Sequence, residues 1–501
     1  MKVTPLFIAG ASALPVEWFS LVKHAQSALI GGVKPIVSSQ EMQQHFSKEA
    51  LEQRANDLYE IAQKSEDQFG HPTRVIGSAG HNGTIEYILN ALADFGSDYY
   101  DVWTQQFAAA MGGVNSFSLA IDGVKYENAS VFSMSPPTKN KEEVTANLAS
   151  ASNLGCDASD YHDVEGCVVL VSRGECPFGQ KSQLAGQAGA VGALIYNNVQ
   201  GEGALSGTLG TPEKDHVPSL ALDYTEGQAL LEKLNSGADV SVVFKVDSYV
   251  ANITTTNVLA QTKSGDKDNV VMLGAHSDSV DAGPGINDDG SGTISLLEVA
   301  KALTNYDVNN AVRFAWWAAE EEGLLGSDYY ANSLSEEENL KVRLFMDYDM
   351  MASPNYAYQV YDGNNVDNPA GSEEIKNLYV NFYQDHGLNY TYIPFDGRSD
   401  YDGFIKNGIP GGGVATGAEV LKTEEEQAMF GGKAGIAFDP CYHERCDDLS
   451  NPDYDAWIVN TRLIAHSVAE FGKSLEGFPV RQPKGSVSIR QLNYHGPQLI
   501  N

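Results

Sequence analysis

Histidine and carboxylate side chains follow a short apolar segment in the second half of the chain. The segment 269–275, NVVMLGA, leads directly into His276 and Asp278, and a loop rich in Gly, Asn and Asp then reaches Asp288. These residue types also dominate solvated turns, for backbone reasons unrelated to catalysis. An EF-hand calcium loop needs an acid at its first position and Glu at its twelfth, where this chain has Gly and Leu. The pattern therefore favours a transition-metal site at the end of a strand.

Two further apolar segments also end in carboxylates. The segment 311–319, AVRFAWWAA, leads to Glu320 and Glu321, and VRLFMDY leads to Asp349. A further histidine, His443, lies in the later segment PCYHERC. Taken alone, a strand-end His or a Glu at a helix start is usually structural. Several such sites at successive strand ends are not expected by chance and predict one shared site.

The combination of side chains predicts a pair of metal ions. Two histidines and three carboxylates suit two zinc ions with one carboxylate bridging them. Asp278, two residues after His276 in an extended segment, could accept the ring N–H and fix the tautomer. Glu320, next to a ligand carboxylate, could act as general base toward water. This chemistry predicts hydrolysis.

The elements that must position these residues alternate along the chain. From about residue 250, short apolar runs alternate with helical stretches, which predicts an α/β fold with a mostly parallel twisted sheet and helices on both faces. In such sheets ligands bind beyond the carboxyl ends of the strands. Upstream, apolar spacing predicts helices over 47–64 and 84–95, and DVWTQQF predicts a strand over 101–107.

Charge and the N-terminal residues limit the possible partners and the compartment. The net charge of −34 over 501 residues argues against binding nucleic acid or an anionic membrane. Residues 1–13 combine a Lys, an apolar stretch and a small-residue site, which are the parts of a secretory signal. No later run reaches the ~18 apolar residues of a membrane span. Asn-x-Ser/Thr triplets typical of a secreted glycoprotein begin at Asn82, Asn128, Asn252 and Asn389.

The five cysteines form two groups in the sequence. In an oxidising compartment we expect Cys441 to pair with Cys446, and Cys156 with Cys176. Cys167 would then be a buried thiol at the start of a strand. The sequence alone leaves a pairing of Cys156 with Cys167 open.

Five ordered segments carry a resemblance to a known family. GAHSDSV…GPGINDDGSG, AAEEEGLLGS, DYDMMASPN, FDGRSDYDGF and PCYHERCDD resemble the motifs of co-catalytic dizinc aminopeptidases of the bacterial secreted and fungal aminopeptidase Y type. They span about 250–475. The resemblance implies Glu320 as general base and two zinc ions, held by His276 and Asp349, by Glu321 and His443, and by a bridging Asp288.

The resemblance also implies roles for two residues outside the ligand set. Tyr442 would help stabilise the tetrahedral oxyanion, and Arg398 would lie near the site and position substrate. Alternatively, Arg398 could hold its loop by pairing with Asp396 or Asp400. A non-proline cis peptide is implied between Asp288 and the next residue.

The chain departs from the family pattern at two positions. Asp347 stands where Asn is commoner, and Glu322 stands where an apolar residue is frequent. Neither is a ligand position, so both leave the metal site intact and could tune substrate preference.

The segment 165–198 carries a second resemblance, to a protease-associated domain: an apolar strand, an Arg-Gly turn, an Ala/Gly-rich helix and a second strand. It implies that an insertion splits the catalytic domain, and that the inserted domain either packs beside the site or forms a wall for peptides. The predicted divisions are a signal peptide (1–13), a leader or propeptide (14–40), a first catalytic part (41–111), the protease-associated domain (112–247), a second catalytic part (248–475) and a C-terminal extension (476–501).

Together these features predict a monomeric zinc aminopeptidase, secreted or in the vacuolar lumen, that releases neutral, leucine-like residues from peptides with a free N-terminus. One alternative is a glutamate-carboxypeptidase-like exopeptidase, although the motifs hold only Arg398 and Arg445 for a substrate carboxylate. A non-catalytic receptor-like homologue would have lost ligands. A one-zinc glutaminyl cyclase would lack the full ligand set.

Overall fold

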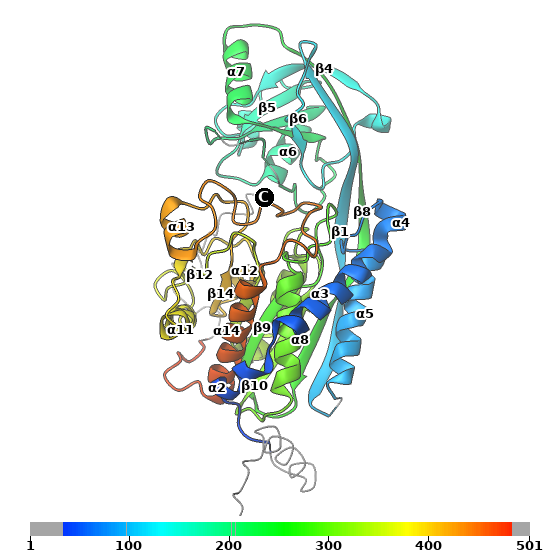
Figure 1. Ribbon diagram of the computed structural model, residues 1–501. Helices are drawn as coiled ribbons and strands as arrows, with labels where there is room; N and C mark the ends of the chain where they lie inside the picture. The colour runs from blue at the N-terminus through cyan, green and yellow to red at the C-terminus, as the bar shows by residue number, and fades with distance from the viewer. Residues whose placement is uncertain (1–33, 97, 202, 206, 483–501) are drawn as a thin grey trace, which may run out of the picture.

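The computed structural model describes residues 34–96, 98–201, 203–205 and 207–482. Two units, one above the other, are joined at the side by the long strands β1 and β8 (Figure 1). The predicted signal peptide, most of the predicted leader and the end of the predicted C-terminal extension lie outside the described residues. Among the described leader residues, Val37 is buried in the lower unit and its N–H donates to Asp307 O.

The lower unit contains a mixed sheet in the order β13-β12-β14-β11-β9-β10-β8. Its central strands β14, β11, β9 and β10 are parallel. β8 runs antiparallel to β10, and β12 runs antiparallel to β14 but parallel to β13. The α/β class is thus confirmed, with parallel strands at the centre of the sheet rather than throughout. The strands are β8 (Ser241–Thr262), β9 (Asp266–His276), β10 (Asn310–Trp317), β11 (Val342–Tyr348), β12 (Gln359–Tyr361), β13 (Thr391–Ile393) and β14 (Gly411–Ala415).

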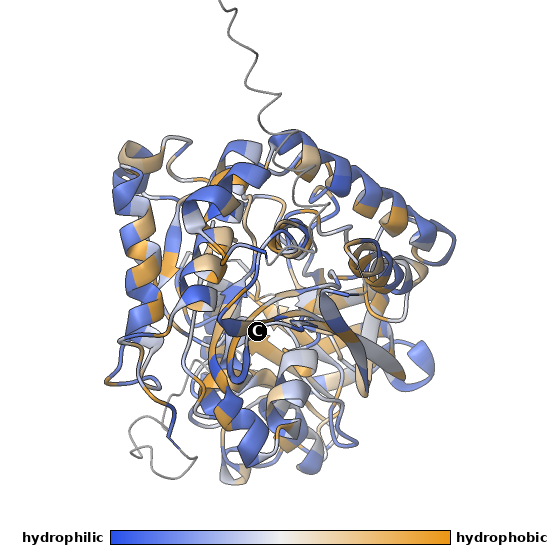
Figure 2. Ribbon diagram, turned by 90° about the horizontal axis from the view of Figure 1, so that it is seen from below, coloured by the Kyte–Doolittle hydropathy of each residue, from blue (hydrophilic) through white to orange (hydrophobic). Residues whose placement is uncertain are grey.

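Helices cover both faces of this sheet, as predicted (Figure 2). Successive side chains of a strand point to opposite faces, so Val271 and Leu273 of β9 enter one core while Val270 and Met272 enter the other. The first core also takes side chains from α2 (Ser39–Met42), α3 (Lys48–Ala62), α5 (Ala79–Asp94), α8 (Gly290–Leu303), α11 (Ser372–Asp385) and α14 (Tyr454–Lys473). The second takes them from α9 (Leu325–Ser333) and α12 (Tyr401–Lys406). Shorter helices are α4 (Glu66–Phe69), α10 (Glu336–Lys341) and α13 (Glu424–Phe430).

The two predicted N-terminal helices begin at serine caps. The Ser47 side chain accepts the N–H of Ala50 at the start of α3, and the Ser78 side chain accepts that of His81 at the start of α5. Such caps satisfy N–H groups that lack partners in the first turn of a helix. The cap at Ser78 explains why α5 begins earlier than the apolar spacing predicted.

β1 (Tyr100–Ile121) and β8 form a two-stranded ribbon that runs from one unit into the other (Figure 1). Their antiparallel register extends from Tyr100↔Thr262 to Ile121↔Val242, with a shift between Val114 and Ser116. The sequence predicted only 101–107 as a strand. The boundaries predicted after residues 111 and 247 fall inside the ribbon, so the insertion leaves and re-enters the lower unit along paired strands. The boundaries themselves remain a prediction.

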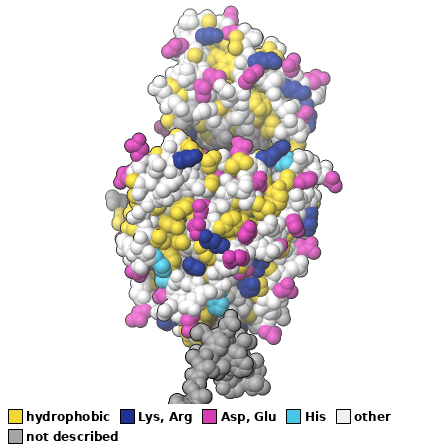
Figure 3. All heavy atoms as spheres, viewed as in Figure 1, with side chains coloured by type: hydrophobic (Ala, Val, Ile, Leu, Met, Phe, Trp, Pro, Cys, Tyr) yellow, Lys and Arg dark blue, Asp and Glu magenta, His cyan; other side chains and the backbone are white. Residues whose placement is uncertain are grey.

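The upper unit contains the strands and helices predicted for its central segment. β5 (Val168–Ser172), α6 (Phe178–Gln187) and β6 (Gly192–Tyr196) follow one another as expected. The other elements are β2 (Val124–Lys125), β3 (Ser130–Val131), β4 (Val144–Ser150), β7 (Ser219–Leu222) and α7 (Tyr224–Asn235). On the visible face of both units, acidic side chains are scattered among basic ones (Figure 3). Within the described residues, no helix has the length and apolar character to span a membrane.

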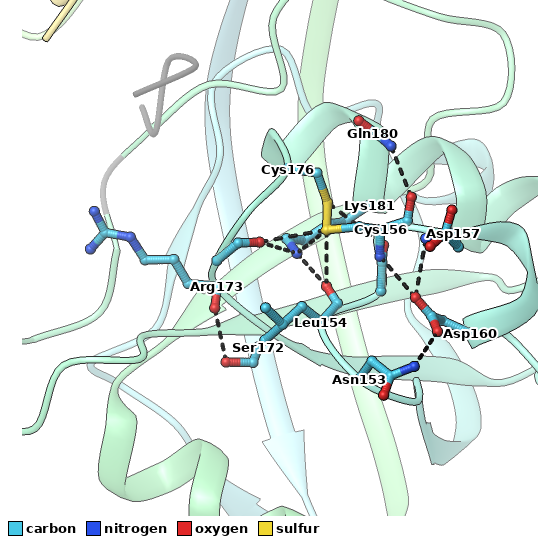
Figure 4. The surroundings of a disulfide bond; sticks show 12 residues. Asn153, Leu154, Cys156, Asp157, Asp160, Ser172, Arg173, Cys176, Gln180 and Lys181 are labelled. Atoms are coloured by element: carbon cyan, nitrogen blue, oxygen red, sulfur yellow. Dashed lines mark hydrogen bonds between the residues drawn. A yellow bond between two sulfur atoms is a disulfide. The ribbon is translucent and has the colours of Figure 1, made fainter. Parts of the chain in front are cut away.

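A disulfide and a buried lysine together hold two loops of the upper unit (Figure 4). Cys156 and Cys176 are bonded at 2.07 Å. The ammonium of the fully buried Lys181 donates to Gly174 O at 2.9 Å and to Leu154 O. Burial lowers the pKa of Lys181 to about 8. The ammonium therefore joins the same loops as the disulfide.

The cysteine pairing follows the expected pattern with one correction. Cys441 and Cys446 form the second disulfide. Cys167 is the free thiol and directly precedes β5, as predicted, but it is half-buried rather than buried. It differs in this respect from Val168 and Val169, whose side chains enter the cores of the upper unit.

Candidate metal centre

The predicted ligands meet at the carboxyl ends of three adjacent strands. β11, β9 and β10 are parallel neighbours, so their ends share one edge of the sheet. His276 is the last residue of β9, Asp349 directly follows β11, and Glu320 and Glu321 follow β10. Asp288 lies just before α8. The topology alone thus brings residues from four segments together.

Asp288 lies between the two histidines. Its Oδ1 is 3.1 Å from His276 Nε2, and its Oδ2 is 3.3 Å from His443 Nε2. His443 comes from the loop that the Cys441–Cys446 disulfide closes. This places one carboxylate where it can contact two cations at once.

Each histidine has further carboxylates beside it. His276 Nε2 lies 3.7 Å from Asp349 Oδ1 and 3.9 Å from Glu320 Oε2. His443 Nε2 lies 3.1 Å from Glu321 Oε2. Two overlapping sets of ligand atoms, His276–Asp288–Glu321 and His276–Glu320–Asp349, each lie within 4.8 Å of one another. All five predicted ligands and the predicted base therefore occupy one site.

The site carries an excess of buried negative charge. Burial raises the pKa of Glu320 well above its usual value. Although burial opposes it, Glu321 and Asp288 raise the pKa of His443 to about 10. Asp349 Oδ1 is buried without a hydrogen-bond donor among the described residues. Such carboxylates need cations, and imidazole with carboxylate oxygen is a donor set that suits zinc.

Asp278 supports the Glu320–Glu321 turn instead of the histidine ring. Its Oδ1 and Oδ2 accept the N–H groups of Glu320 and Glu321, each at 3.3 Å. Its Oδ1 is 3.9 Å from His276 Nδ1, which is too long for the predicted hydrogen bond. In this structure Asp278 therefore positions the proposed base and its neighbour through their backbone.

Asp289 forms hydrogen bonds to three segments that meet at the site: the end of β9, the start of α8 and the loop after β11. Its carboxylate accepts the N–H groups of His276 at 3.1 Å, Gly292 at 2.8 Å and Met350 at 3.1 Å. It caps α8 through Gly292. The peptide between Asp288 and Asp289 is cis, as the resemblance implied.

Asp447 is a supporting residue that sequence reasoning missed. Its Oδ1 accepts the N–H of Asn287 and its Oδ2 that of Asp288, both at 2.9 Å. Burial raises the pKa of Asp447 to about 8. Because it directly follows Cys446, it connects the disulfide loop to the bridging carboxylate. In the sequence, the signal that could have identified Asp447 was its position at the end of the segment PCYHERCDD.

Tyr442 and Arg398 lie at the exposed side of the site. Tyr442 stacks on His443 with ring centroids 3.8 Å apart, and burial raises its pKa, so its hydroxyl stays a donor. Arg398 Nη1 pairs with Glu419 Oε1 at 3.0 Å. The sequence had suggested Asp396 or Asp400 as the partner that would hold the loop. The partner is instead on a different loop, after β14.

The two departures from the family pattern are both buried beside the site. Asp347, in β11, is fully buried, and Glu322 is 7% exposed. Burial raises the pKa of Asp347 to about 7 and that of Glu322 well above its usual value. Their effect on substrate preference remains a prediction.

Comparison with known proteins defines the class. Residues 257–468 match peptidase family M28, and residues 144–230 match the PA domain. The chain is 52% identical to aminopeptidase Y of Saccharomyces cerevisiae over 476 residues, covering 93% of this chain and 86% of that protein. It is 46% identical to leucine aminopeptidase 2 of Arthroderma otae, covering 93% and 92%. The chain therefore belongs to peptidase family M28 and carries an inserted PA domain.

Solved structures show the same fold. The aminopeptidase from Aneurinibacillus sp. strain AM-1 superposes with a TM-score of 0.70 at 26% identity, covering 90% of this chain and 98% of that one. A zinc aminopeptidase from Bacillus subtilis, at 24% identity, has a TM-score of 0.59 and covers 87% and 98%. Both structures therefore share the fold of this chain over most of its length.

Proposed function

We propose that this peptidase is a zinc aminopeptidase that removes neutral, leucine-like residues from peptides with a free N-terminus. The observation that carries the proposal is Asp288, whose two oxygens face two different histidines. The names of the relatives, aminopeptidase Y and leucine aminopeptidase 2, support the same activity.

The geometry supports a site for two zinc ions. His276 and Asp349 would hold one ion, Glu321 and His443 the other, and Asp288 would bridge them. The two oxygens of Asp288 lie 3.1 and 3.3 Å from the two histidines.

Bound zinc would polarise the scissile carbonyl and lower the pKa of water. Glu320, whose pKa burial raises, accepts the proton of the attacking water and delivers it to the leaving amine. The Tyr442 hydroxyl donates to the developing oxyanion of the substrate. Arg398, near Tyr442, would help position the peptide.

The charge of the site favours a free α-ammonium. The carboxylates Glu320, Glu321 and Asp349 surround the histidines, whereas the nearby ionised arginine, Arg398, is paired with Glu419. Carboxylates around the zinc ions would also attract a free α-ammonium, which an acetylated amine lacks. This asymmetry supports an exopeptidase acting at the N-terminus.

We further propose that the protein is a secreted or vacuolar monomeric glycoprotein without nucleic-acid or membrane partners. The signal-like residues 1–13 and the charge of −34 support this. The four glycosylation triplets begin at asparagines that are exposed in the structure, which are Asn82, Asn128, Asn252 and Asn389. The predicted division into leader, split catalytic domain, PA domain and C-terminal extension belongs to the same proposal.

Hydrolysis of Leu-p-nitroanilide by the purified protein tests the activity, beside the N-acetylated compound. We expect cleavage of the free amine only, loss with a chelator and recovery with about two zinc ions per chain. Equal cleavage of the acetylated compound would contradict the N-terminal preference. No cleavage despite bound zinc would favour a carboxypeptidase or a non-catalytic homologue.

A further inference from the structure

A segment before the PA domain lies along the loop that joins the two ends of the metal centre. Residues 71–81 follow α4 and enter α5, and the loop 277–285 joins His276 to the bridging Asp288. Near the start of the segment, His71 Nε2 lies 2.8 Å from Asp281 O, and Thr73 Oγ1 donates to Val280 O at 2.9 Å. Further along, the Arg74 N–H donates to Ser279 Oγ at 2.9 Å, and His81 Nε2 lies 3.1 Å from Ser277 Oγ. The segment thus contacts this loop repeatedly along its length.

The side chain of Arg74 is enclosed by this loop. It is fully buried. Its Nε donates to Pro284 O at 2.8 Å, its Nη2 to Gly285 O at 2.6 Å and its Nη1 to Ser277 O. One guanidinium therefore satisfies carbonyls at both ends of the loop, and only its fixed planar fork presents donors in these directions.

The backbone around Arg74 leaves little room for another arrangement. Gly285 has φ +61°, and a Cβ there would lie 2.1 Å from Asp288 O and 3.0 Å from Arg74 Nη2. A Cβ on Gly283 would lie 2.3 Å from Glu444 O, in the disulfide loop that carries His443. The loop is therefore packed between the guanidinium on one side and the ligand-bearing segments on the other.

Arg74 has two opposite effects on a cation in the site. Its charge repels a metal ion, whereas its hydrogen bonds hold the loop that ends in Asp288. The carbonyls of Ser277, Pro284 and Gly285 would lose a buried donor without it, which is unfavourable. Because three such bonds hold one loop, we expect the positional effect to exceed the repulsion.

We propose that Arg74 is a positioning residue of the metal centre, which shapes the loop 277–285 so that His276 and Asp288 are set in place before metal binds. The proposal rests on the proposed zinc site. It assigns a function to the N-terminal segment, which lies outside the residues 257–468 that match the peptidase family.

Zinc affinity of full-length variants, measured by competition with a chelator, tests the proposal. Arg74→Lys keeps the charge and loses the fork, and Arg74→Met loses both. We expect both to bind zinc about 10- to 100-fold more weakly, the effect of losing partners that orient ligands. Arg313→Lys and Arg313→Met are matched controls, because Arg313 is 8% exposed and binds Gln261 and Tyr330. Unchanged affinity, or tighter binding by Arg74→Met, would overturn the proposal.

Hydrogen exchange of the metal-free proteins separates this proposal from the zinc site itself. In Arg74→Lys the amides of 277–289 should exchange at least about tenfold faster than in wild type, while α11 stays protected. Ser279→Ala, which removes the acceptor of the Arg74 N–H, should act in the same direction and provides a milder variant. If wild type bound no zinc, the proposed function would fail while this comparison would remain valid. Equal exchange in all proteins would overturn the role of Arg74.

Discussion

The two histidines of the metal centre approach opposite oxygens of one carboxylate: His276 Nε2 lies 3.1 Å from Asp288 Oδ1, and His443 Nε2 lies 3.3 Å from Asp288 Oδ2. These histidines come from a strand end and from a disulfide loop 167 residues further along the chain. A carboxylate placed in this way suits a bridge between two metal ions about 3.5–4 Å apart. In the proposed zinc site, Asp288 would be the residue on which both ions depend.

Asp288→Asn should remove zinc from both positions. The amide keeps the shape but replaces one ligand oxygen with a donor and removes the charge. We expect zinc affinity to fall more than about 100-fold, since changes that only reorient ligands already cost 10- to 100-fold. Metal analysis after dialysis measures the zinc per chain. The control is Asp94→Asn, at the exposed end of α5. If Asp288→Asn retained two zinc ions, the bridging role would be refuted.

Glu320→Gln should stop catalysis without removing zinc. The amide cannot accept the proton of water, so kcat should fall by about 10²- to 10⁴-fold. The zinc content should stay at the wild-type value, because Glu320 is assigned as the base and not as a ligand. Steady-state kinetics and metal analysis of one preparation check both. Loss of a zinc ion would reassign Glu320 as a ligand. The control is Glu337→Gln, at an exposed position.

Removal of the Cys441–Cys446 disulfide should weaken zinc binding. The bond closes the loop that holds His443. Its loss gives the unfolded chain conformational freedom that corresponds to about 2 kcal/mol. Asp447 still anchors the end of the loop through the N–H groups of Asn287 and Asp288, so affinity should fall without unfolding. Chelator competition on the double Ala variant measures the effect.

The matched control for that experiment is the other disulfide. Replacing Cys156 and Cys176 by Ala removes a disulfide that closes a longer loop and stabilises the fold by about 3 kcal/mol. This disulfide lies in the unit that holds no site residues. Its removal should lower the melting temperature and leave zinc affinity unchanged. Equal zinc affinity in both double variants would show that the disulfide does not position His443.

Asp328→Asn should stabilise the protein at high pH only. Asp328 is in α9, and burial raises its pKa from 3.8 to about 6. The folded state therefore binds the proton more tightly than the unfolded state. Ionised Asp328 destabilises the folded state fully above pH 6, and this destabilisation disappears as pH falls toward 3.8. Two pKa units correspond to at most about 3 kcal/mol, and partial exposure reduces this to about 1–2 kcal/mol.

Melting temperatures at pH 8 and pH 4 measure the effect of this substitution. We expect Asp328→Asn to raise the melting temperature by about 2–4 °C at pH 8 and to leave it unchanged at pH 4. The exposed Asp94→Asn should change neither value. An equal gain at both pH values would show that the pKa of Asp328 is not the cause.

Local sequence pattern was enough to predict the elements that carry the site. β9 and β10 are apolar runs that end beside the predicted site residues, and α3 begins next to the predicted residue 47. The start of α5 was predicted at residue 84 but lies at Ala79, because Ser78 caps the helix. The pattern failed for β1, predicted over 101–107, because its continuation through Gly112 and Gly113 is stabilised by pairing with β8 and not by its own periodicity. It also failed for the half-buried Cys167, whose exposure depends on how the upper unit packs.

The sequence by itself determined the chemistry of this protein, because ligand identity is a property of side-chain type: imidazole from His276 and His443 and carboxylate from Asp288 and its partners. Only the tertiary structure decided which atoms meet. The Asp278 carboxylate supports the backbone of the Glu320–Glu321 turn, and Arg74 reaches a loop more than 200 residues away in the sequence. Such contacts depend on how distant segments pack, and short-range spacing carries no record of that packing.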